Sequence, residues 1–239
     1  MATVYQGDVL EVLQTLPSNS IDLVLTDPPF SSGTRREAAK GLRKAMNRAG
    51  DKKEWFGSDS LTVDGFLFLM RSCALEWHRL LRDGGHVLCF IDWRMLSHLG
   101  DAIESADFRR CGVLVWDKTY FGMGSCFRNQ HEMILHFTKD QGRPPERRDV
   151  GNVLQAKPVR NGEHPTEKPV ELLEKLISVV CPPRGVVLDP FMGSGSAGVA
   201  AVNSGRCFIG VEREEHYVGI SARKIEAAEA LIAAELIGE

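Results

Sequence analysis

The fold of this chain is decided by residues 186–196, which read Val186-Val187-Leu188-Asp189-Pro190-Phe191-Met192-Gly193-Ser194-Gly195-Ser196. The apolar residues predict a buried strand and the glycines predict a tight turn, after which a helix is expected over Ala197 to Asn203. A second strand, Cys207 to Val211, ends at the acidic residue Glu212. This order of strand, glycine-rich turn, helix, strand and acidic residue is typical of a nucleotide-binding βαβ unit and predicts a parallel α/β sheet.

The chemistry of this turn points away from a phosphate ligand. The turn is not G-x-G-x-x-G, and Asp189 stands where it would repel a pyrophosphate. A carboxylate there favours a ligand with a cationic head, and the ammonium group of S-adenosylmethionine has this character. Gly193 and Gly195 would let the backbone approach the ligand, and Glu212 would accept hydrogen bonds from its ribose hydroxyls. The alternative is a packing turn with a structural carboxylate.

A second motif, Thr26-Asp27-Pro28-Pro29-Phe30, follows an apolar run from Ser20 to Leu25 that predicts a buried parallel strand. Prolines carry no backbone N–H donor, so this turn offers mainly carbonyl acceptors beside the Asp27 carboxylate. Phe30 adds a flat apolar surface. Acceptors beside an aromatic face suit a planar ring that bears an amine, such as a nucleobase. The alternative is a rigid loop in which Asp27 is only a turn residue.

Positive charge is concentrated directly after this motif. The segment from Ser31 to Lys53 carries a net charge of +6, although the whole chain carries −3. At the rim of a site such a segment predicts contacts with a phosphate backbone, and the alternative is a solvated surface. The residues expected to contact nucleic acid are Arg35, Arg36, Lys40, Arg43, Lys44 and Arg48.

The composition indicates one α/β domain without a membrane span. No apolar run reaches the length of about 18 residues that a transmembrane helix needs, and the amino terminus does not resemble a signal peptide. The six cysteines are scattered without a C-x-x-C pair. This spacing argues against a zinc site or a disulfide framework, so we expect no metal and a reducing, cytoplasmic location.

The remaining elements follow from hydrophobic periodicity and from turn residues. Residues 31–59 and 141–163 lack a period and predict loops. The strands at 111–116 and 132–137 predict an antiparallel pair at a sheet edge. The apolar stripe of a helix over Leu61 to Leu81 predicts core packing, with dimerisation as the alternative. Further strands are expected at 3–6 and 86–91, and further helices at 9–16, 94–105, 170–180 and 215–236.

Three motifs together carry a family resemblance. Asp27-Pro-Pro-Phe30, His164-Pro-Thr-Glu-Lys-Pro169 and Asp189-Pro-Phe-x-Gly-Ser-Gly195 occur in this order and resemble the amino-group DNA methyltransferases of the permuted β class. The resemblance covers nearly all of the chain outside 31–59. It implies a Rossmann-like α/β methyltransferase fold, with a mostly parallel seven-stranded sheet, one antiparallel edge hairpin and a circularly permuted motif order. The chain would begin near the third strand, and the cofactor strands would come last yet lie beside the catalytic strand.

The resemblance also implies roles for individual residues. Asp27 and the Pro28 carbonyl would accept hydrogen bonds from the target amine, Pro29 would complete the motif, and Phe30 would stack on the base. Asp8 would bind the adenine amine of the cofactor and Glu212 its ribose. The other residues expected to form the cofactor pocket are Thr166, Lys168, Asp189, Phe191, Gly193, Ser194 and Gly195.

These roles imply an S-adenosylmethionine-dependent methyltransferase that flips a base out of duplex DNA and methylates it without a covalent enzyme intermediate. By family habit, Asp27 in the first motif position favours adenine N6. The alternatives are N4-cytosine, RNA or protein-amide methylation and a non-catalytic binding module. We expect a single catalytic domain over 1–239, with a basic DNA-contacting insertion at about 31–59 and a short candidate recognition region at about 118–163. Whether the protein forms a homodimer, and whether it acts with a cognate restriction nuclease, stays open.

Overall fold

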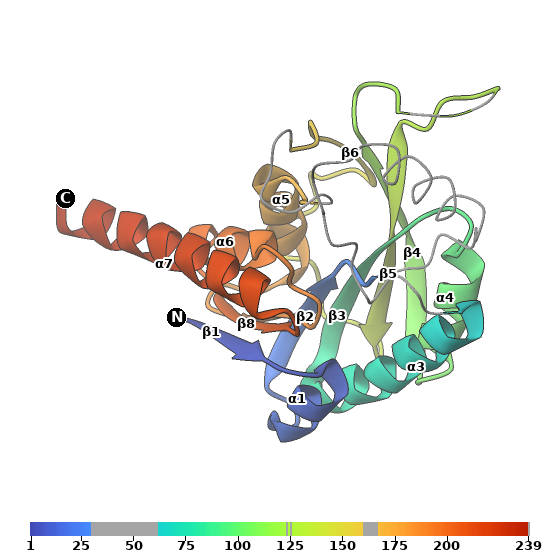
Figure 1. The fold of residues 1–239 in the computed structure, drawn as a ribbon, viewed down its shortest axis with the longest axis horizontal. Helices are drawn as coiled ribbons and strands as arrows, with labels where there is room; N and C mark the ends of the chain where they lie inside the picture. The colour runs from blue at the N-terminus through green and yellow to red at the C-terminus, as the bar shows by residue number, and fades with distance from the viewer. Residues whose placement is uncertain (30–61, 123, 125, 160–166, 239) are drawn as a thin grey trace, which may run out of the picture.

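The protein is described by a computed structural model over residues 1–29, 62–122, 124, 126–159 and 167–238. Within these residues, one eight-stranded sheet has the order β1-β8-β7-β2-β3-β5-β4-β6 (Figure 1). The predicted mostly parallel α/β fold is confirmed, since β5 alone runs against its neighbours. The strands are β1 (Ala2–Gln6), β2 (Ile21–Thr26), β3 (Leu81–Ile91), β4 (Phe108–Asp117), β5 (His131–Lys139), β6 (Val153–Gln155), β7 (Val186–Asp189) and β8 (Cys207–Glu212).

Helices cover both faces of the sheet (Figure 1). On one face lie α1 (Val9–Thr15), α3 (Val63–Leu80) and α4 (Leu96–Glu104), whose core cluster includes Phe66 and Trp77. On the other face lie α5 (Val170–Val180), α6 (Ser196–Asn203) and α7 (Glu215–Gly238), whose cluster includes Leu172 and Phe208. The sheet is therefore buried from both sides, which explains why all six residues of β2 are buried.

The permuted order places early and late strands of the chain side by side. β2 pairs in parallel with β7 on one side and with β3 on the other. The chain leaves β7 through α6 toward β8, and it leaves β2 through α3 toward β3, so the two connections diverge. A crevice at the carboxyl ends of two such strands is where open α/β sheets bind ligands. The expectation that the late strands lie beside the early catalytic strand is confirmed.

The edge of the sheet differs from the prediction. β5 lies between β3 and β4 and is antiparallel to both, while β6 pairs in parallel with β4 and forms the outer edge. The antiparallel pair is therefore one strand inside the edge. The sheet has eight strands where seven were predicted, because β6 lies in a stretch predicted to be a loop. β6 has three residues, of which Leu154 alone is buried. So short a strand gives no readable period.

The start of β3 also differs from what the sequence indicates. The turn residues Asp83-Gly84-Gly85 predict a break between helix and strand, but α3 ends at Leu80 and β3 begins at Leu81. The pairing with β2 is irregular here, as it passes from Ile21 opposite Leu81 to Leu23 opposite His86. Gly84 has φ +72°, and a Cβ at this position would lie 2.8 Å from the backbone N of Arg143. The glycines thus allow a bulge within the strand rather than a break before it.

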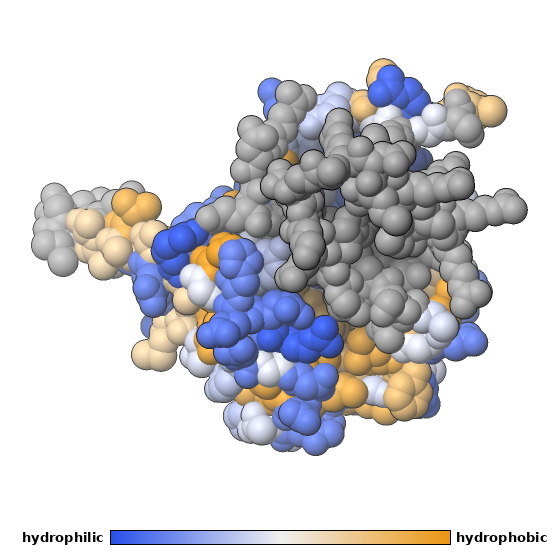
Figure 2. Space-filling view, in the orientation of Figure 1, coloured by the Kyte–Doolittle hydropathy of each residue, from blue (hydrophilic) through white to orange (hydrophobic). Residues whose placement is uncertain are grey.

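The apolar stripe of α3 packs into the core. Phe66, Met70 and Trp77 are fully buried, as predicted, whereas the stripe member Leu75 is 48% exposed. With Phe68, which is 74% exposed, Leu75 contributes hydrophobic surface on α3, and Figure 2 shows hydrophobic residues at the surface in this part of the molecule. Within the described residues, no helix combines the length and the apolar character that crossing a bilayer requires.

Candidate active site

The two principal motifs meet at the carboxyl ends of β2 and β7. The hydroxyl of Thr26, the last residue of β2, donates a hydrogen bond of 2.9 Å to Oδ1 of Asp189, the last residue of β7. The same oxygen accepts a 3.1 Å hydrogen bond from the backbone N–H of Phe191. Since both donors are neutral, they stabilise the Asp189 carboxylate without neutralising its charge.

Burial of Asp189 changes its acidity. Loss of water around the carboxylate raises the pKa of Asp189 to about 7, although the bonds from Phe191 and Thr26 oppose the rise. The negative charges of Asp27 and Glu212 raise this pKa further. A cation bound beside Asp189 would favour its ionised form, so the site is suited to a positively charged ligand.

Glu212 closes the glycine turn from the neighbouring strand. Its Oε2 accepts a 3.0 Å hydrogen bond from the backbone N–H of Gly193, and its Oε1 accepts one of 2.8 Å from the backbone N–H of Glu214. A carboxylate oxygen offers two lone pairs, so each oxygen retains a place for a further donor. Beside the turn, the buried hydroxyl of Ser196 has no hydrogen-bond partner among the described residues. These groups supply several acceptors around one turn.

The second glycine of the turn is needed for packing. Gly195 has φ +82°, in the left-handed region that glycine adopts without strain. A Cβ on Gly195 would lie 2.7 Å from the Cβ of Ser221 on α7. A side chain here would therefore clash with α7, and the approach of Gly193 and Gly195 to a ligand stays a prediction. Phe191 is partly buried, and Ser194 is buried.

Asp8 lies near Glu212 and caps a helix. The backbone N–H of Gly7 donates a 3.0 Å hydrogen bond to the carbonyl of Glu212. Oδ1 of Asp8 accepts a 2.9 Å hydrogen bond from the backbone N–H of Leu10 and so caps α1. Its predicted contact with a cofactor adenine stays a prediction.

Asp27 has one occupied oxygen and one without a partner. Its Oδ2 accepts a hydrogen bond from Nζ of Lys168, which immediately precedes the α5 cap at Pro169. Its Oδ1 is buried and has no partner among the described residues. Burial raises the pKa of Asp27 above its ordinary value, and the Lys168 ammonium opposes the rise. An acceptor without a donor in a buried position is a place for a ligand N–H. The next residue, Pro28, is buried, and Pro29 is partly buried.

Two charged residues outside the sequence motifs extend this contact. Lys168 Nζ also lies 3.4 Å from Oε2 of Glu132 at the start of β5, and Oε1 of Glu132 lies 2.5 Å from Nζ of Lys118 after β4. We call these four residues (Asp27, Lys168, Glu132 and Lys118) the charged row. The signal in the sequence was position, because Lys118 follows one predicted strand and Glu132 begins the next at the same rim.

Several predicted site residues lie outside the part of the chain that the structure describes. These residues are Phe30, Arg35, Arg36, Lys40, Arg43, Lys44, Arg48 and Thr166.

In the described part, His, Cys, Asp and Glu side chains form no group of three or more that could hold a metal ion.

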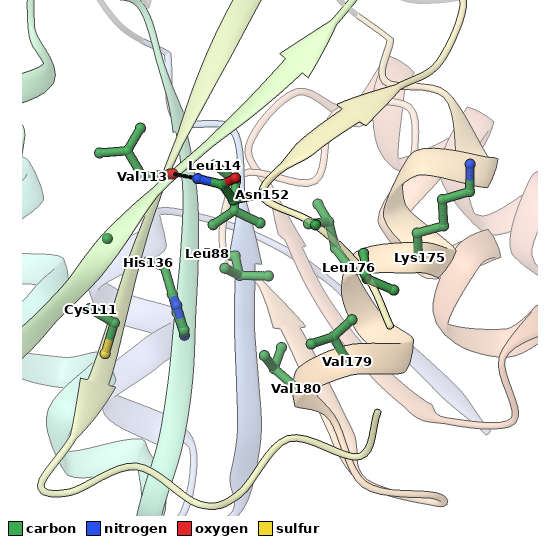
Figure 3. Close-up of a pocket in the computed structure, with 13 residues that line it drawn as sticks. Leu88, Cys111, Val113, Leu114, His136, Asn152, Lys175, Leu176, Val179 and Val180 are labelled. Carbon is green, nitrogen blue, oxygen red and sulfur yellow. Dashed lines mark hydrogen bonds between the residues drawn. The ribbon is translucent and has the colours of Figure 1, made fainter. Parts of the chain in front are cut away.

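A separate hollow of about 310 Å³ lies between β4 and α5. Figure 3 shows side chains of α5, including Leu176 and Val180, facing those of β3, β4 and β5 across it. It contains none of the predicted site residues, and its lining is mainly apolar. The chemistry of the motifs is therefore concentrated at the strand ends and not in this hollow.

Comparison with known proteins agrees with this geometry. A family model described as DNA methylase matches residues 21–223. The chain is 35% identical to the "Putative methylase YubD" of Escherichia coli K12 over 96% of this chain and 92% of that protein. Two solved structures share the fold. The M1.HpyAVI–SAM complex has a TM-score of 0.68, 23% identity and coverage of 94% of this chain and all of that chain. PvuII DNA methyltransferase (cytosine-N4-specific) has a TM-score of 0.71, 21% identity and coverage of 100% and 93%. The match across most of the chain and the close relative show that this protein belongs to the family of amino-group DNA methylases.

Proposed function

We propose that the protein transfers a methyl group from S-adenosylmethionine to an exocyclic amine of a base in duplex DNA, with adenine N6 as the target. The observation that carries the proposal is Oδ1 of Asp27, a buried acceptor without a donor among the described residues, at the rim of the sheet. Family membership supplies the reaction class, and Asp27 supplies the acceptor that an amine target needs.

The residues around the glycine turn fit this cofactor. The Asp189 carboxylate suits an ammonium group, and Glu212 has acceptor capacity for ribose hydroxyls in addition to its bonds to the turn. Ser196 offers a further buried polar atom without a partner in the described part of the chain. The related M1.HpyAVI protein forms a complex with the same cofactor. When bound, S-adenosylmethionine supplies an electrophilic methyl group on a sulfonium.

The protein's part in the reaction is to make the amine available. The lone pair of a base amine is delocalised into the ring, so the amine is a poor nucleophile. Asp27 Oδ1 would accept a hydrogen bond from one N–H, and the Pro28 carbonyl would accept one from the other. These two bonds favour a pyramidal nitrogen with a localised lone pair, and orientation contributes much of the rate. Asp27 would also accept the proton that the amine loses.

Two surfaces are proposed to hold the duplex. One is the basic insertion at about 31–59, and the other is the connector between β4 and β5, which extends beyond the sheet in Figure 1. On this connector, Phe127 is 93% exposed and Phe121 is 61% exposed. The guanidinium of Arg128 lies 5.5 Å from the centre of the Phe121 ring. Exposed aromatic rings and a cation suit contacts with bases and phosphates.

N4-cytosine methylation is the second candidate, because PvuII DNA methyltransferase, described as cytosine-N4-specific, shares the fold over the whole of this chain. Incubation with labelled S-adenosylmethionine and duplex DNA, followed by digestion to nucleosides, separates the two. Label in N6-methyladenine supports the proposal, and label in N4-methylcytosine replaces it with the second candidate. Label only in RNA or protein, or no transfer to any polymer, would contradict both.

A further inference from the structure

The charged row places alternating charges beside the proposed acceptor. Its four groups come from the end of β2, the segment before α5, the start of β5 and the end of β4. Lys168 Nζ lies between the carboxylates of Asp27 and Glu132, and Lys118 lies on the far side of Glu132. The side chains of Lys168 and Glu132 are 9% and 24% exposed. Water therefore screens these charges weakly, so each group strongly affects the next.

The row is held by apolar neighbours as well as by its ion pairs. Lys168 Nζ lies 5.1 Å from the centre of the Phe90 ring, and Lys118 Nζ lies 4.9 Å from that of Trp116. Trp116 is itself fixed by a 2.9 Å hydrogen bond from its indole N–H to the carbonyl of Ala156. The two ammonium groups are thus held over rigid rings, and Glu132 connects them.

Glu132 changes what Lys168 does to Asp27. A lysine paired with Asp27 alone would concentrate its charge on that carboxylate and make it a weaker acceptor for another donor. A second carboxylate 3.4 Å from Nζ shares the ammonium. Lys118 in turn balances the charge of Glu132, so the shared arrangement does not leave a buried carboxylate in excess.

We propose that Glu132 is a positioning residue for methyl transfer: it shares the Lys168 ammonium with Asp27, which leaves the second oxygen of Asp27 available and strongly accepting toward the target amine. This inference rests on the proposed role of Asp27. It assigns a function to the start of β5 and to Lys118 behind it, which acts through Glu132.

The directions of the electrostatic effects make the role testable. The charge of Glu132 raises the pKa of Asp27, whereas the charges of Lys168 and Lys118 lower it. From β7, the carboxylate of Asp189 also interacts with that of Asp27. From β3, Cys89 faces Asp27, and burial raises the pKa of its thiol so far that it stays neutral in an assay. Removing Glu132 or Lys118 should therefore move the titration of Asp27 in opposite directions.

The experiment is the pH dependence of kcat for methyl transfer to duplex DNA in the full-length protein and its variants. S-adenosylmethionine is kept saturating, so that the titration of Asp189 in the free protein does not set the acid limb. Glu132→Gln should lower kcat about tenfold and move the acid limb of the profile to lower pH. Lys118→Gln should move the limb to higher pH. Glu132→Asp keeps the charge, so its acid limb should lie close to that of the wild-type protein.

A matched control separates this role from general stabilisation. Glu76 is 23% exposed and forms a 2.7 Å ion pair with Arg79 on α3, away from the row. Glu76→Gln should leave the acid limb in place. A carbon NMR titration of the Asp27 carboxyl, assigned with Asp27→Asn and recorded without cofactor or DNA, measures the same displacements independently of activity.

The outcomes distinguish the inference from the proposed function. Opposite displacements in both measurements support the positioning role. Unmoved limbs, or limbs that move in the same direction, in variants of an active enzyme overturn this role and leave the proposed function standing. A wild-type protein that methylates no DNA overturns both.

Discussion

The two halves of the rim stabilise their carboxylates in different ways. On the β7 side, Asp189 and Glu212 are bonded by backbone N–H groups and a hydroxyl, which carry no net charge. On the β2 side, Asp27 is bonded by the ammonium of Lys168, which Glu132 shares. Neutral donors leave the β7 side attractive to a cation, whereas the charged row leaves the β2 side nearly balanced and suited to a neutral base. The difference favours the cofactor in one half and the target in the other.

The strongest way to break this division is Asp27→Ala. We expect methyl transfer to fall about a hundred- to a thousandfold, because the amine loses the acceptor that localises its lone pair. Cofactor affinity, measured by calorimetry, should stay within about twofold, since Asp189 and Glu212 remain. Asp83→Ala, at a side chain that is 89% exposed, is the control. Full activity of Asp27→Ala would exclude the acceptor role.

The next largest effect concerns the polymer. Replacing Arg35, Arg36, Arg43 and Lys44 together by Gln should weaken duplex binding by about ten- to a hundredfold at moderate salt. The slope of log affinity against log salt should flatten by about 0.9 for each phosphate that the protein no longer neutralises. Fluorescence anisotropy across a salt series measures both. An unchanged slope would show that the insertion does not contact phosphates and is only a solvated surface.

On the cofactor side, Asp189 should make binding depend on pH. Burial raises its pKa to about 7 without ligand, so a substantial fraction of the carboxyl groups is protonated near neutrality. A cationic ligand binds the ionised form, so its affinity should be full well above pH 7 and fall up to about tenfold per unit below it. Calorimetry in buffers of different ionisation enthalpy should detect proton release on binding at pH 6.

Asp189→Asn is the matched test of this dependence. The variant should bind S-adenosylmethionine more weakly at pH 8 and lose the decline between pH 7 and pH 6. If the decline persists in the variant, another group titrates and the assignment to Asp189 is wrong.

The smallest expected effect lies on the connector between β4 and β5. Phe127→Ala should weaken duplex binding by about 1 kcal/mol, the lower end of what stacking of a base on an aromatic ring contributes. Cofactor affinity should not change. Leu231 is also an exposed apolar residue, but it lies on α7, so Leu231→Ala provides a control for general surface effects. Equal effects of the two substitutions would show that the connector is not part of the surface that binds the duplex.

The sequence predicts the framework of the site better than its electrostatics. The motifs around Asp27 and Asp189 are readable because strand, turn and helix signals surround them. Their permuted order also predicts that β2 and β7 are neighbours, which the structure confirms. The contact between Thr26 and Asp189 joins residues 163 positions apart and has no local signal.

The position of Lys118 and Glu132 at one rim was readable, but the pairing of charges within the charged row was not predictable, for the same reason. Lys168 and Asp27 are 141 positions apart, and Glu132 and Lys118 are single charged residues in stretches without a motif. Local patterns cannot pair such residues. Similarly, β6 is too short for a period, and the bulge at Gly84 has the same composition as a turn.

The most direct test of the division between the two halves is single-turnover methyl transfer at saturating S-adenosylmethionine by Asp27→Asn and Asp189→Asn, with cofactor affinity measured on the same preparations. We predict that Asp27→Asn binds the cofactor normally and transfers methyl groups about a hundred- to a thousandfold more slowly. Lys168 would hold the amide oxygen, so the amide would turn an N–H donor toward the target amine in place of the acceptor. Asp189→Asn should bind it more weakly and recover most of the transfer rate at saturation. Normal transfer by Asp27→Asn, or loss of cofactor binding in that variant, would contradict the account.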